Sequence, residues 1–233
     1  MIARVARRAR YVALLALRTR APLAPLTATV LAAIGVYAYP RSGVGETWGL
    51  TALMACALSA WLVGAVLAAE PVAQADIATV ALGGRHGRTG LDATLVVLVA
   101  AGQAAWLVSY PLVARRLGYT DVFVPPPRAV DVFVAVLAHL CCALAGGSLA
   151  VLFAPPRLAR RASAAAAVMA SLLVIVAASR PLGALGGPAA VAVALTDARL
   201  HTITTRELIA CTSCLVLATA LTIAAMHWAN TRG

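Results

Sequence analysis

The chain has 233 residues, of which 62% are hydrophobic and only 12% charged, with a mean hydropathy of +0.91. Soluble domains carry roughly 25% charged residues, so the composition excludes a water-soluble globular protein and predicts an all-α, polytopic membrane protein. All 19 basic residues are arginine, which excludes a P-loop or a catalytic lysine, and we expect no enzyme activity in this chain.

Residues 1–22 are predicted to form an amphipathic helix that lies in the membrane interface. Their apolar face repeats at helical spacing, and several arginines lie away from it, where they can meet anionic lipid head groups. This face consists of Val5, Ala9, Val12 and Ala16. Pro22 and Pro25 are then expected to turn the chain into the first span. A basic tail without fixed structure is the alternative.

Residues 23–233 are predicted to form a transmembrane domain of six spans. A span needs about 20 apolar residues, with a range of roughly 17–25. The predicted spans are residues 23–39, 48–69, 91–114, 130–153, 163–179 and 208–228, of which the first and fifth are short. An even number of spans places both termini on one side. That side holds 12 arginines against seven on the other, which favours cytoplasmic termini. The net charge of +11 is therefore no indication of nucleic-acid binding.

The loop at residues 70–90 joins the second and third spans and is unusually polar. Pro71 is suited to a first helical turn and Gly83-Gly84 to a helix end, so a short cytoplasmic helix parallel to the membrane is predicted between them. Its polar groups are candidates for contact with a soluble partner: Glu70, Gln74, Asp76, Arg85 and Arg88. An interfacial helix without a partner is the alternative.

Polar residues within the predicted spans are few, and five are candidates for lining a substrate path. These are Gln103, Trp106, Ser109, Tyr110 and His139. An ionisable group inside a membrane is a functional candidate by default, so His139 is also considered as a proton relay, beside its simpler interpretation as a packing residue.

The sequence contains five cysteines. The cysteines all lie in apolar stretches, and they are interpreted as buried packing residues. A soft-metal site with His139 is a weaker alternative, and we expect neither metal nor cofactor.

Ala145, Gly146 and Gly147 are expected to allow close helix contact. Residues 180–195 contain helix breakers and a short apolar stretch, so either a re-entrant segment or an outer loop helix is predicted.

This order of elements resembles the permease subunit of a bacterial ATP-binding-cassette exporter of the ABC-2 type. The resemblance rests on the basic helix before the first span, the six spans, the internal termini and the helix that begins near Glu70. It implies a cytoplasmic-membrane permease that pairs with a second permease copy or with a homologous permease. It also implies a separate ATPase subunit, on which the loop at 70–90 docks as a coupling helix.

A six-span secondary transporter is the alternative function, and a membrane scaffold without transport is another. A secondary transporter would need coupling-ion carboxylates within its spans, whereas Asp92 and Asp131 lie at span ends.

Overall fold

The computed structural model describes residues 2–38, 44–119, 123 and 126–153, together with seven single positions between 216 and 227. All regular secondary structure within these residues is helical. The predicted spans at 163–179 and, apart from those single positions, 208–228 lie outside the described residues. So does the predicted break at 180–195.

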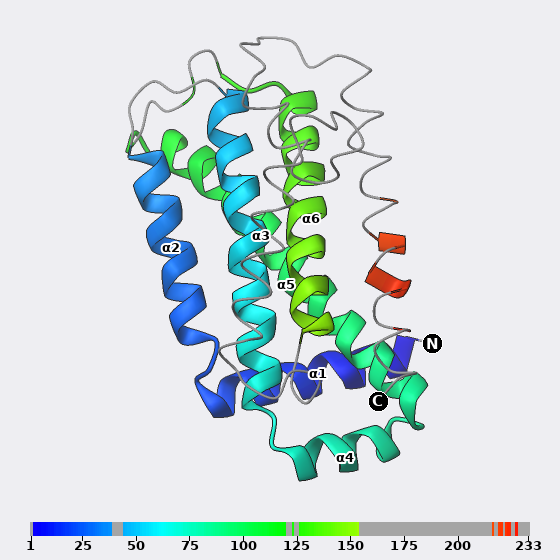
Figure 1. The fold of residues 1–233 in the computed structure, drawn as a ribbon. Helices are drawn as coiled ribbons and strands as arrows, with labels where there is room; N and C mark the ends of the chain where they lie inside the picture. Colours follow the sequence, from blue (N-terminus) through cyan, green and yellow to red (C-terminus); the bar gives the residue numbers. More distant parts are fainter. Residues whose placement is uncertain are drawn as a thin grey trace.

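The three longest described helices are α3 (Val44–Ala69), α5 (Arg85–Arg116) and α6 (Ala129–Leu152). Each is long and apolar enough to cross a membrane, which matches the second, third and fourth predicted spans. α3 and α6 pack side by side, and α5 crosses behind them at a steep angle (Figure 1). The chain is therefore a helical, membrane-embedded protein.

The first predicted span is shorter than expected. Residues 23–39 were to cross the membrane, but α2 (Leu23–Tyr37) has only 15 residues, or about 22 Å at 1.5 Å per residue. That is less than a hydrocarbon core of about 30 Å. α2 reaches spanning length and composition only together with α1 (Ile2–Thr19), from which a 91° bend separates it. The bend falls at Arg20, whose φ is +53°, and at Pro22, the N-cap of α2.

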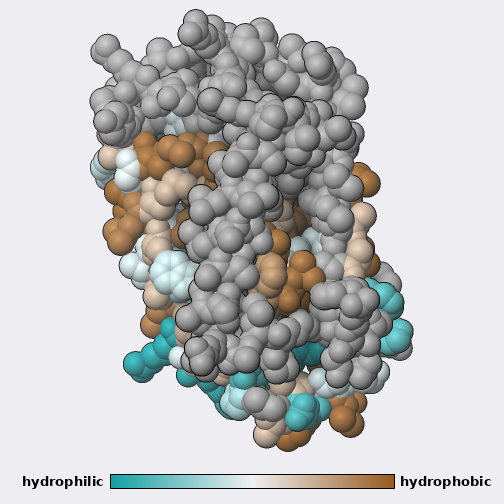
Figure 2. Space-filling view, in the orientation of Figure 1, coloured by the Kyte–Doolittle hydropathy of each residue, from teal (hydrophilic) through white to brown (hydrophobic). Residues whose placement is uncertain are grey.

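α1 lies across one end of the bundle, and α4 (Val72–Ala81) lies at the same end (Figure 1). We call this the α1/α4 end. Val12 and Leu15 of α1 are buried against the core, whereas Arg10 and Arg18 are exposed. Figure 2 shows apolar residues along the sides of the bundle and most of the visible hydrophilic residues near the α1/α4 end.

The predicted short helix within 70–90 is confirmed, but the third predicted span begins too late. Pro71 is the N-cap of α4, and Gly83 and Gly84 follow it with φ of +92° and +78°. α5 then begins at Arg85 and not at residue 91. Arg85 and Arg88 therefore belong to α5, and the connecting segment ends at Gly84.

The close contact predicted from the small residues of α6 is confirmed. A Cβ at Gly146 would overlap the carbonyl group of Cys56 on α3, and one at Gly147 would meet Val96 of α5 and Val63 of α3. Because glycine has no side chain, α6 approaches the backbone of α3 directly.

Candidate functional site

Glu70 and Arg88 form an ion pair inside the protein. Arg88 Nη2 lies 2.7 Å from Glu70 Oε2, and its Nε donates to Asp92 Oδ1 at 3.2 Å. Tyr11 of α1 donates to Glu70 Oε1 at 2.5 Å. The Glu70 side chain is only 3% exposed. We call Tyr11, Glu70, Arg88 and Asp92 the Glu70 cluster; it ties α1, the start of α4 and the start of α5 together.

The Glu70 cluster corrects the prediction that all five polar residues face a partner. The Glu70 side chain is buried and that of Arg88 is largely buried; they pair with each other, because an unpaired charge inside a protein is costly. Gln74 and Asp76 are exposed, which contact with a partner requires. For Arg85 only the backbone is described, in the first turn of α5.

The exposed face of α4 combines a carboxylate with large apolar side chains. Ile77 is 70% exposed and Val80 is 79% exposed, and Asp76 is exposed beside them. Residues three or four apart share one face of a helix, so Asp76 and Ile77 both lie on the side of Val80. Neither apolar residue was among the predicted partner contacts, although their helical spacing was visible in the sequence. We call Asp76, Ile77 and Val80 the α4 face.

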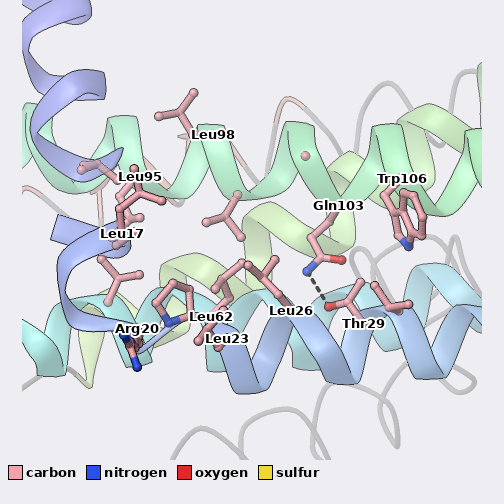
Figure 3. Close-up of a pocket in the computed structure, with 17 residues that line it drawn as sticks. Leu17, Arg20, Leu23, Leu26, Thr29, Leu62, Leu95, Leu98, Gln103 and Trp106 are labelled. Atoms are coloured by element: carbon pink, nitrogen blue, oxygen red, sulfur yellow. Dashed lines mark hydrogen bonds between the residues drawn. The ribbon is translucent and has the colours of Figure 1, made fainter. Parts of the chain in front are cut away.

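A cleft of about 610 Å³ opens between α1, α2, α3 and α5 (Figure 3). Its walls are mostly leucine and valine, and the polar residues in its lining include Arg20, Thr29 and Gln103. Gln103 Nε2 donates to Thr29 Oγ1 at 3.1 Å. Arg20 lies at the end where α1 bends into α2, while Gln103 and Trp106 lie toward the other end.

Of the five predicted path residues, only Gln103 and Trp106 line this cleft. Tyr110 packs its ring between Trp106 and Tyr37, with centroids 5.4 Å and 5.8 Å away. Ser109 is exposed and contacts the Trp106 carbonyl at 3.4 Å. His139 is fully buried and lies outside the cleft lining.

His139 belongs to a buried polar network that sequence analysis did not anticipate. Its Nδ1 lies 2.7 Å from the Ala135 carbonyl, and its Nε2 lies 3.0 Å from Thr51 Oγ1. Thr51 also lies 3.3 Å from the Tyr37 hydroxyl, which donates to the Leu107 carbonyl at 2.7 Å. These contacts connect α6, α3, α2 and α5.

The Ala135 carbonyl places one proton of His139. A carbonyl only accepts, so Nδ1 donates to it, while Nε2 contacts a hydroxyl that is also within reach of the Thr47 and Trp48 carbonyls. Both ring nitrogens are therefore used within the protein, as expected of a packing histidine. Tyr37 and Thr51 gave no signal in sequence, since both residue types occur commonly in membrane helices.

No family model matches this chain, and comparison with the curated proteins and with solved structures finds no match either.

Proposed function

We propose that the chain is the permease subunit of an ATP-binding-cassette exporter in the bacterial cytoplasmic membrane. In this proposal a separate ATPase hydrolyses ATP, a second permease copy completes the pathway, and six spans are present. The observation that carries the proposal is the α4 face, held on a helix whose start is fixed by the Glu70 cluster.

The composition of the α4 face favours a protein partner over lipid. A helix that lies in the membrane interface separates its apolar and charged residues onto opposite faces. In α4 the carboxylate of Asp76 stands on the same face as Val80, 79% exposed, and beside Ile77. An apolar centre with an adjacent charge is typical of protein interfaces.

The Glu70 cluster supports the coupling role that we propose for α4. The Glu70–Arg88 ion pair joins the start of α4 to α5, and the Tyr11 hydrogen bond joins it to α1. A force applied to α4 by a closing ATPase would therefore pass to α5, a helix of spanning length. Interfaces joined in this way move as rigid bodies.

The α1/α4 end is assigned to the cytoplasm in this proposal. The arginine distribution supports the assignment, and α1 brings exposed arginines to the same end as α4. We propose that α1 lies in the inner interface, where these arginines meet anionic lipids.

A proton-coupled secondary transporter is the second candidate, favoured by the buried His139. Its weakness is that, among the described residues, no carboxylate bonds to His139 or to Thr51. Asp92 of α5 and Asp131 of α6 are each bonded to a neighbouring arginine.

The test of the proposal reverses the charge on the α4 face. Asp76→Arg is expected to reduce co-purification of the ATPase at least tenfold and to abolish substrate-stimulated ATP hydrolysis, since a mismatched charge at an interface costs several kcal/mol. Tyr119→Arg is the control, because Tyr119 is 81% exposed just beyond the far end of α5. Unchanged association and stimulation in both Asp76→Arg and Ile77→Asp would reject the ATPase partnership.

A further inference from the structure

The cleft between α1, α2, α3 and α5 has an acceptor atom without a donor. Gln103 is 4% exposed, and its Oε1 has no hydrogen-bond partner among the described residues. The Thr29 hydroxyl donates to the Pro25 carbonyl at 2.8 Å. Thr29 therefore has only lone pairs to offer Gln103, which fixes the amide with Nε2 toward Thr29. Oε1 is therefore the amide atom without a hydrogen-bond partner among the described residues, and Gln103 lines the cleft.

A cation stands at the other end of the same cleft. Arg20 lines it at the bend between α1 and α2, where it is exposed. Among the described residues no carboxylate forms a salt bridge with it. Thr29 lies six residues beyond Leu23, the start of α2, or roughly 9 Å along the helix axis. The cleft thus offers a positive charge, then apolar walls, and then a hydrogen-bond acceptor.

The apolar walls are accessible from the side of the bundle. Leu17 is 77% exposed, Leu23 is 57% exposed, and both line the cleft. Figure 3 shows them beside Arg20, whereas Gln103 and Trp106 lie further along. A volume of about 610 Å³ is that of a small-molecule site. A chain-like molecule can therefore enter from the membrane with its polar head left at the bend.

We propose that this cleft binds an anionic amphiphile that carries a hydrogen-bond donor partway along its apolar chain. The anionic head group pairs with Arg20, the chain lies against the leucines and valines, and the donor satisfies Gln103 Oε1. An ordinary phospholipid offers only ester acceptors at that depth, so it leaves Oε1 unpaired. The inference rests on the proposed function, because it names the class of molecule that the permease exports.

The experiment measures binding to the purified full-length protein in nanodiscs made of zwitterionic lipid. The probes are a hydroxystearate with its hydroxyl near mid-chain and stearate, which differ only in the donor. The wild type is expected to bind the hydroxylated probe about three- to tenfold more tightly, as one net hydrogen bond provides. Gln103→Leu should bind both probes equally. Arg20→Gln should weaken both by a similar factor.

Two further variants keep the result interpretable. Gly102→Leu adds a side chain to the cleft at a position where a Cβ meets nothing within 4 Å, so it should block both probes without disturbing the fold. Ser109→Ala, outside the cleft, should change nothing. The inference would be overturned if the wild type bound hydroxystearate and stearate equally, or if Gln103→Leu preferred hydroxystearate as strongly as the wild type does. If the probes do not bind as expected but Asp76→Arg still reduces ATPase co-purification, the inference is wrong and the proposed function stands.

Discussion

Glu70 and Arg88 show how a buried charge acquires its role from its neighbours. Both were expected to face a partner, because they stand in a polar stretch between long apolar spans. In the structure Glu70 accepts from Tyr11 and pairs with Arg88, which also holds Asp92. The hydrogen bond between Tyr11 and Glu70 joins residues 59 positions apart in the chain. No local pattern in a single sequence could have revealed it.

The first prediction concerns Arg88. Arg88→Ala leaves the Glu70 carboxylate, 3% exposed, without its cation. Breaking a buried pair in this way costs about 3 kcal/mol or more, so Tm in nanodiscs should fall by about 6–12 °C. Arg18→Ala, at an exposed position of α1, should leave Tm unchanged. Equal Tm values for the two variants would show that the Glu70 cluster does not hold α1 and α4 in place.

The second prediction concerns the His139 network. Thr51→Val keeps the shape of the side chain but removes the hydroxyl between His139 and Tyr37. Each buried group left unpaired costs about 1–3 kcal/mol, so Tm should fall measurably. Thr51→Ser restores the hydroxyl and should recover most of the loss. A Thr51→Val protein as stable as the wild type would contradict a structural role for this network.

At the scale of helices, sequence predicted what local chemistry determines. Pro71 and the glycines at positions 83 and 84 define α4 well, because proline and glycine restrict the backbone whatever surrounds them. The start of α5 was misjudged because the third span was taken from the apolar run alone, which begins after the polar residues at 85–90. In the structure Gly87 packs near the Leu82 carbonyl and Gly90 against Arg8. The contact with Arg8 comes from α1, and such tertiary packing overrides the weak helix propensity of glycine.

The third prediction tests the packing of α3 against α6. Gly146→Ala places a methyl group against the Cys56 carbonyl, which forces two backbones apart at a cost of about 1–3 kcal/mol. Gly35→Ala on α2 meets nothing within 4 Å and should raise stability by up to about 1 kcal/mol, because alanine is the better helix former. Thermal unfolding of both variants should therefore shift in opposite directions. A shift in the same direction would contradict this packing.

At the scale of the whole molecule, the composition correctly predicted a helical membrane protein, and three helices have spanning length and composition. The candidate site was predicted less well. Gln103 and Trp106 were placed together, but the cleft also depends on Arg20 and on the bend between α1 and α2. Hydropathy reports how apolar a segment is and not how two segments are angled, so the bend and its cleft emerged only with the structure.

The fourth prediction concerns orientation in the membrane. In a background without native cysteines, Ala81→Cys on α4 should react with a membrane-impermeant thiol reagent only after the cells are permeabilised. Tyr119→Cys, beyond the far end of α5, should react in intact cells. Both positions are exposed, so neither should disturb packing. Labelling of Ala81→Cys from outside would place α4 on the wrong face for an ATPase.

The most direct test of the central claim is photo-crosslinking from the α4 face in living cells. A photoreactive amino acid at Ile77, 70% exposed, should crosslink to an ATPase that carries a P-loop and is encoded in the same operon. The same amino acid at Tyr119 should not. The Ile77 crosslink should weaken when Asp76→Arg is added. Crosslinks from Ile77 to lipid alone, or only to other parts of this chain, would contradict the account that α4 couples the permease to an ATPase.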